Sequence, residues 1–123
     1  MSLLKKKEVV QAVITQMKAF DEDVLVETKL LENYKIPDKI VWKSTGVGFF
    51  PDLKITIPSE KSMLYEVELS TKINIEKWRL FSLTARQQNG DFTVVVPECM
   101  IGRVETIIAE KNFKNIKLMF VPN

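Results

Sequence analysis

The chain has 123 residues, 46% of them hydrophobic, so it can bury one good core but is short for two, and we expect a single domain over residues 1–123. A formal net charge of +2 is too small to indicate a protein held to nucleic acid by charge alone. With no histidine and one cysteine, the sequence excludes Ser-His-Asp, Cys-His and zinc-histidine chemistry. Any metal would take oxygen ligands, which suit magnesium, manganese or calcium.

The cellular setting follows from two absences in the sequence. No apolar run approaches the roughly 18 residues of a membrane span, and Lys5, Lys6 and Lys7 interrupt the start of the chain in a way that does not fit a signal peptide. The single cysteine, Cys99, cannot form an internal disulfide, which suits a reducing compartment. We therefore expect a cytoplasmic protein with no membrane partner.

Helical periodicity dominates the N-terminal part of the chain. Apolar residues recur every three or four positions over residues 4–20, which predicts an amphipathic helix. Residues 21–35 begin with capping aspartates and keep leucines near helical spacing, which predicts a second helix or helical turn. Pro37 would end this second helix.

Three strands are predicted in the middle of the chain. Residues 39–43 are β-branched and aromatic, while residues 49–57 and 62–70 alternate apolar and polar side chains. A short turn at residues 58–61 makes the last two strands a hairpin.

The remaining elements alternate between helix and strand. Residues 75–88 predict a helix that packs Trp78 and Phe81 into the core, and the largely apolar residues 92–96 predict a central strand covered on both faces. A further helix over residues 99–111 precedes a last strand over residues 116–121. This order predicts an α/β fold with a mixed sheet flanked by helices.

Three carboxylates fall on neighbouring positions of the predicted hairpin. Asp52 lies on the polar face of one strand, and Glu66 and Glu68 lie two residues apart on one face of the other, so the three can converge. Like charges in a partly buried sheet raise one another's pKa and require a compensating cation, for which a divalent metal is suited. The alternative is that they form the solvated face of an antiparallel hairpin.

The sequence Pro-Asp at positions 51–52, followed by Tyr-Glu-Val-Glu at 65–68 on the hairpin partner, resembles the PD-(D/E)xK nuclease superfamily. The resemblance covers roughly residues 9–97. It implies a restriction endonuclease-like core of order αβββαβ, with the last helix and strand as a C-terminal αβ extension. It also implies a metal-dependent nuclease that hydrolyses DNA phosphodiesters with Mg²⁺ or Mn²⁺.

The resemblance assigns roles to residues of the hairpin. Asp52 is similar to the metal-binding aspartate, Glu66 to the second acidic ligand, and the carbonyl of Val67 to a further oxygen ligand. Glu68 stands where most members carry lysine, and it would act as a third ligand or as the base. Glu8 is the nearest match to the acidic residue that members often add from the first helix.

Three lysines are candidates for the positive charge that Glu68 does not supply. Lys54 shares a strand face with Asp52, Lys72 follows Glu68 by four residues, and Lys77 begins the next helix. We favour Lys72.

Nucleic-acid contacts are expected from the helix over residues 75–88. Lys77, Arg79 and Arg86 could touch a DNA backbone, although the two arginines could equally serve only solubility. The sequence thus predicts a nuclease or nuclease-like domain acting on DNA. The alternatives are a catalytically inactive member of the fold that binds nucleic acid or a protein partner, and a homodimer that pairs through its last strand.

Overall fold

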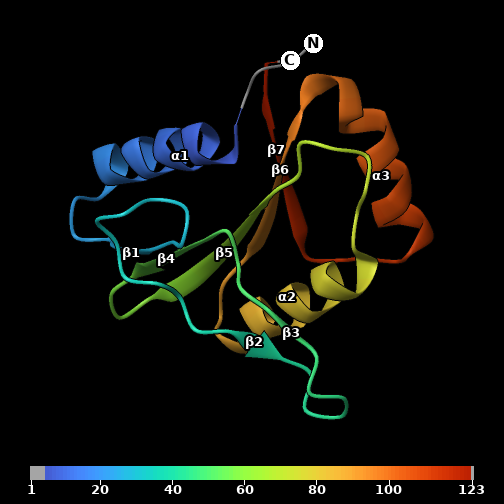
Figure 1. The fold of residues 1–123 in the computed structure, drawn as a ribbon, viewed down its shortest axis with the longest axis horizontal. Coiled ribbons are helices and arrows are strands. Elements are labelled where there is room, and N and C mark those ends of the chain that lie inside the picture. Colours follow the sequence, from blue (N-terminus) through green and yellow to red (C-terminus); the bar gives the residue numbers. More distant parts are fainter. Residues whose placement is uncertain (1–4, 123) are drawn as a thin grey trace.

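The computed structural model describes residues 5–122, in which a mixed sheet lies between helices (Figure 1). In chain order the elements are α1 (Lys6–Phe20), β1 (Leu25–Glu27), β2 (Ile40–Val41), β3 (Gly48–Phe49), β4 (Leu53–Ile57), β5 (Lys61–Val67), α2 (Ile75–Gln87), β6 (Phe92–Pro97), the 3₁₀ turn η1 (Glu98–Met100), α3 (Ile101–Glu110) and β7 (Ile116–Val121). The predicted first helix is therefore confirmed from Lys6 onward, whereas its first predicted residue, Leu4, lies outside the described part of the chain.

The main sheet has five strands in the order β1-β4-β5-β6-β7. The pairs β1–β4 and β4–β5 are antiparallel, whereas β6 runs parallel to β5 and β7 runs parallel to β6. Parallel neighbours need a crossover connection, and α2 and α3 provide the two crossovers. The predicted α/β class, with a mixed sheet flanked by helices, is confirmed.

Each face of the sheet carries its own hydrophobic core (Figure 1). On one face α1 buries Val9, Val13 and their neighbours against β4 and β5. On the other face Trp78 and Phe81 of α2 and Val104 of α3 pack against β5 and β6. Because both faces are covered, every residue of β6 is buried, including Thr93, although β5 is the middle strand of the five.

The second predicted helix, over residues 21–35, is wrong. The first part of this segment forms β1, which pairs antiparallel with β4, and the rest consists of turns in which Thr28 N donates to Lys35 O at 2.9 Å. Val24, Leu30 and Leu31 still pack into the core beside α1. The same spacing of apolar residues allows burial in either a turn or a helix. The periodicity of the sequence therefore could not distinguish between these two structures.

The two strands predicted over residues 39–43 and 49–57 also differ from the structure. The two-residue strands β2 and β3 pair with each other in a separate small sheet, and Trp42 and Phe49 pack against the core that α2 covers. The chain then leaves extended pairing at Pro51 and Asp52 before β4 begins. A proline has no N–H to donate to a neighbouring strand, which accounts for a break at this point.

The hairpin and the C-terminal elements match their predictions. β4 and β5 pair with Leu53 opposite Tyr65, so Met63, Tyr65 and Val67 face α1, and Leu64 and Glu66 face α2. Helices α2 and α3 and strand β7 lie where the periodicity places them. No helix within residues 5–122 is both long and apolar enough to cross a membrane.

Among the four glycines, Gly90 leaves the least room for a side chain. A Cβ added at Gly90 would lie 1.6 Å from the Ser62 carbonyl oxygen, whereas one added at Gly102 on α3 would meet nothing within 4 Å. We expect Gly90→Ala to lower the free energy of unfolding by at least about 2 kcal/mol, because backbone must move, and Gly102→Ala to cause no loss. Urea unfolding followed by circular dichroism measures both. Equal stability of the two variants would contradict this packing.

Candidate active site

Asp52 and Glu66 are tied to each other where β4 begins beside β5. The Asp52 backbone N donates to Glu66 Oε1 at 2.9 Å, and the Val67 backbone N donates to Asp52 Oδ2 at 2.9 Å. Each carboxylate therefore accepts a hydrogen bond from the backbone of the opposite segment. This reciprocal pairing makes the hairpin register set the distance between the two acids.

Thr28 anchors the bend that carries Asp52. Its side chain is fully buried, donates from Oγ1 to the Asp52 carbonyl at 2.7 Å and accepts from Leu30 N at 3.1 Å. Thr28 was not among the predicted site residues, because its segment was predicted helical. No motif marks it either, since the bond goes to a backbone carbonyl that any residue would offer.

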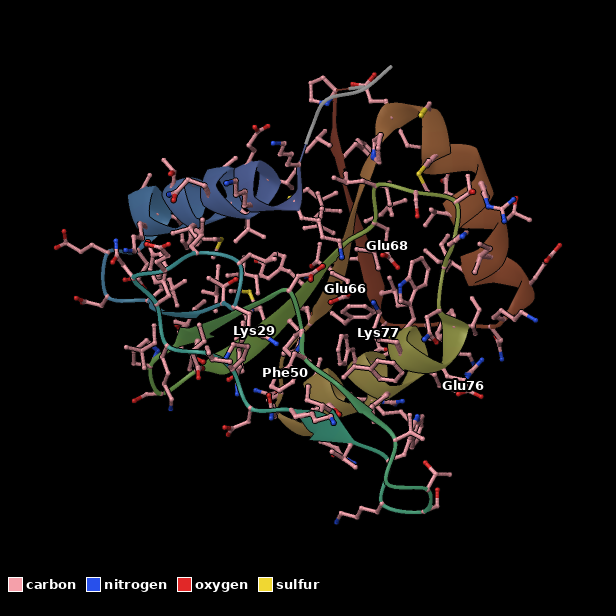
Figure 2. All side chains as sticks on the ribbon, in the orientation of Figure 1. Lys29, Phe50, Glu66, Glu68, Glu76 and Lys77 are labelled. Atoms are coloured by element: carbon pink, nitrogen blue, oxygen red, sulfur yellow. The ribbon has the colours of Figure 1, made fainter. Side chains whose placement is uncertain are left out.

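Two lysines approach the acidic pair from different helices. Lys77 Nζ lies 2.6 Å from Glu66 Oε2, and Lys6 Nζ lies 3.1 Å from Asp52 Oδ2. Glu66 Oε2 is buried and accepts no hydrogen bond of regular geometry, so its contact with Lys77 is an ion pair. Figure 2 shows Lys77 and Glu66 facing each other between α2 and β5.

The position of Lys77 is set by the start of α2. Asn74 is the N-cap residue, and its side-chain Oδ1 accepts from the Lys77 backbone N at 3.0 Å. This bond satisfies one of the free N–H groups of the first turn and fixes where the lysine side chain leaves the helix.

The side chain of Glu68 contacts Trp78 of α2 and is not hydrogen-bonded to Asp52 or Glu66. Its Oε2 accepts from Trp78 Nε1 at 2.9 Å, and the residue is only 6% exposed. Glu66 is 0% exposed. The alternative interpretation, in which these glutamates form the solvated face of a hairpin, is therefore wrong for this sheet.

Burial controls the protonation of this cluster. Loss of hydration and, to a smaller extent, the charge of Asp52 together raise the pKa of Glu66 to about 7, against the lowering effect of Lys77 and Lys6. Burial also raises the pKa of Glu68, against the effect of Lys77 and of the Trp78 hydrogen bond. Burial alone would lower the pKa of Lys77, but its attraction to Glu66 leaves that pKa above the ordinary value.

The donor set suits a hard cation, although the three acids do not form a ready metal cage. Within residues 5–122, no group of three or more Asp, Glu or Cys side chains is placed to hold a metal ion. The predicted convergence of all three carboxylates is thus reduced to the pair Asp52 and Glu66. What this pair offers is carboxylate oxygen, including the buried Glu66 Oε2 that lacks a regular hydrogen bond.

The other predicted residues of the site lie apart from this pair. Lys72 is exposed beside the start of α2, and Lys54 lies opposite Leu64 in the β4–β5 register. Within the described residues neither forms an ion pair with the cluster, so Lys77 and not the favoured Lys72 brings positive charge to it. Glu8 is exposed on α1, and the group that α1 contributes is the cation Lys6.

An exposed aromatic ring lies on the segment that leads to Asp52, and a lysine lies over it. Phe50, two residues before Asp52, is 40% exposed, and the Lys29 Nζ lies 4.4 Å from its ring centroid (Figure 2). An exposed ring held under a lysine gives the segment leading to the acidic pair an aromatic, positively charged surface. Sequence analysis did not single out this pair.

Arg79 and Arg86, predicted to touch nucleic acid together with Lys77, are exposed on α2 and line a separate pocket with Lys114. Of the three predicted nucleic-acid contacts, Lys77 therefore lies at the acidic pair, and the two arginines lie at the separate pocket.

No family model, curated protein or solved structure matches this chain.

The raised pKa of Glu66 predicts a pH-dependent stability. Because the folded state binds this proton more tightly than the unfolded state, the stabilisation is complete below the ordinary value of 4.5 and is lost as pH rises through about 7. We expect the free energy of unfolding to fall by about 2 kcal/mol between pH 5 and pH 8, and this fall to shrink in Glu66→Gln.

Urea titrations across this pH range would measure the effect. Glu98→Gln, on the exposed turn before α3, is the matched control and should keep the wild-type slope. An unchanged slope in Glu66→Gln would show that another group is responsible.

Proposed function

We propose that this protein is a metal-dependent nuclease of the restriction endonuclease-like fold, which hydrolyses DNA phosphodiesters. The observation that carries the proposal is the reciprocal pair Asp52 and Glu66 with Lys77 at 2.6 Å. Two acidic oxygen ligands and one cation are the groups that metal-assisted hydrolysis of a phosphodiester requires.

The order of elements supports the fold assignment. With β1 in place of the strand expected over residues 39–43, the elements α1, β1, β4, β5, α2 and β6 follow the order αβββαβ. These four strands, β1, β4, β5 and β6, also lie side by side in the main sheet in the order in which they occur in the chain. Helix α3 and strand β7 form the C-terminal αβ extension.

Asp52 and Glu66 are the residues that would hold Mg²⁺ or Mn²⁺, with the Val67 carbonyl as a further oxygen ligand, whereas Glu68 is held by Trp78. The fit rests on donor chemistry: both residues offer carboxylate oxygen, and the buried Glu66 Oε2, which lies 2.6 Å from Lys77 Nζ, belongs to a group whose pKa is raised by burial and by Asp52. When bound, such a metal supplies an activated water and stabilises charge on the phosphate.

Lys77 would supply the positive charge that most PD-(D/E)xK members take from the residue at the position of Glu68. Its ammonium is held inside the site by Glu66 and by the Asn74 cap of its own helix. From there it can hydrogen-bond a phosphate oxygen or orient the attacking water, because an ammonium has three donors and no acceptor. It also competes with a metal ion for Glu66 Oε2.

A catalytically inactive nuclease-fold protein that binds nucleic acid or a protein partner is the second candidate. The observation in its favour is that Lys6 and Lys77 already neutralise Asp52 and Glu66, one ion pair each. In this case the cluster would serve only to fix the hairpin against α1 and α2.

Metal titration separates the two candidates. We expect Mn²⁺ to bind the wild type measurably by calorimetry at pH 8 and Mg²⁺ to support cleavage of plasmid DNA. Asp52→Ala should lose both, since it removes an oxygen ligand. No metal binding at millimolar concentration, or cleavage unchanged in Asp52→Ala, would overturn the nuclease proposal.

The role of Lys77 has its own test. Lys77→Met should keep metal binding at pH 8, because the ammonium competes with the metal, but should lower the cleavage rate by about 100-fold or more, as expected for loss of a charge-stabilising donor. Lys72→Met, which removes the exposed lysine near the start of the same helix, is the matched control and should keep the wild-type rate. Equal rates for the two variants would remove Lys77 from the mechanism.

A further inference from the structure

The pocket lined by Arg79, Arg86 and Lys114 lies on a different side of α2 from Lys77. Arg79 follows Lys77 by two residues, which is a rotation of about 200° around a helix. The pocket has a volume of about 120 Å³ and lies between α2 and the turn that follows α3. Its polar lining consists of Arg79, Ser82, Arg86, Asn112, Lys114 and Asn115.

The charge of this pocket is one-sided. Arg79, Arg86 and Lys114 line it, and no carboxylate does. Within residues 5–122, none of these three side chains forms an ion pair with an acidic group. Three cations that share a concave surface without a counter-charge repel one another, and a bound anion would relieve that repulsion.

The walls of the pocket are held in place by contacts of their own. Arg79 donates from Nη2 to the Lys111 carbonyl at 3.3 Å, and its guanidinium carbon lies 4.7 Å from the Phe113 ring centroid. Asn115 donates from Nδ2 to the Ser82 carbonyl at 3.0 Å and accepts from Ser82 Oγ. These bonds fasten the turn to α2, so the donors are positioned before any ligand arrives.

We propose that this pocket binds a phosphate group. The guanidinium groups present paired N–H donors that match phosphate oxygens, and Lys114 adds a mobile point charge. The volume of about 120 Å³ suits one phosphate group. The phosphate belongs either to a small anion or to a nucleic-acid end or backbone, and this proposal does not rest on the nuclease reaction.

The first experiment titrates inorganic phosphate into the full chain at constant ionic strength, followed by ¹H–¹⁵N spectra. We expect saturable shifts around residues 112–115 with a dissociation constant in the millimolar range, on the order of 1 mM. Arg86→Ala and Lys114→Ala should weaken binding about tenfold each. Arg79 is left intact, because its contacts with Phe113 and Lys111 hold the fold.

Arg103→Ala, on the exposed side of α3, is the matched control and should bind phosphate as the wild type does. Shifts that do not saturate, or equal weakening by Arg103→Ala and Arg86→Ala, would overturn the proposal and indicate general surface charge. Asp52→Asn should leave phosphate binding unchanged, which separates failure of this pocket from failure of the proposed active site.

The source of the phosphate is resolved by a second arm with short DNA oligonucleotides. If a 5′-phosphorylated oligonucleotide binds more tightly than the same strand without phosphate, and Arg86→Ala abolishes the difference, the ligand is a nucleic-acid end. If both strands bind alike but lose affinity in Arg86→Ala, it is the backbone. Binding of inorganic phosphate alone assigns the pocket to a small anion. If Arg86→Ala and Lys114→Ala both bind phosphate as tightly as the wild type, all three assignments of the ligand are contradicted.

Discussion

The rest of the structure depends on one electrostatic constraint, the burial of the Glu66 carboxylate on an otherwise apolar face of the sheet. Glu66 is fully buried and lies on β5 two residues after Leu64, facing Lys77 of α2. Moving an unpaired carboxylate out of water costs at least several kcal/mol, about the whole stability of a small domain. The fold must therefore bring a cation and backbone donors to this point. Lys77 and the Asp52 N–H are the groups it brings.

Meeting this constraint links parts of the chain that are far apart in sequence. Asn74 caps α2 so that Lys77 points at the sheet, and Thr28 holds the bend from which Asp52 reaches Glu66. The close approach of Gly90 to Ser62 lets β6 run beside β5, which places Val94 next to Glu66 in the register. Asn74, Thr28 and Gly90 take no part in the proposed chemistry of the site. Each instead sets the place of a group that carries charge.

The sequence was most informative where burial follows a regular period. The alternation along β5 and the helical period of α2 predicted both elements and the faces of Glu66 and Trp78. It was least informative where a turn buries apolar residues, since Leu30 and Leu31 pack without a helix. The choice between Lys72 and Lys77 was also beyond it, because which lysine reaches Glu66 depends on the angle at which α2 crosses the sheet. That angle comes from packing in three dimensions, which residue spacing does not encode.

Helix α2 unites the two proposals, because it presents cations to two different surroundings. Lys77 is largely buried and its charge is neutralised by an ion pair with Glu66. Arg86, in contrast, is exposed and lines a pocket without a carboxylate. An ion pair that is already satisfied contributes to folding and must be rearranged for a ligand to enter. Unanswered cations in a preformed pocket hinder folding slightly and are ready to bind. The acidic pair should therefore be the slower and more selective of the two sites, and the basic pocket the first point of contact for an anion.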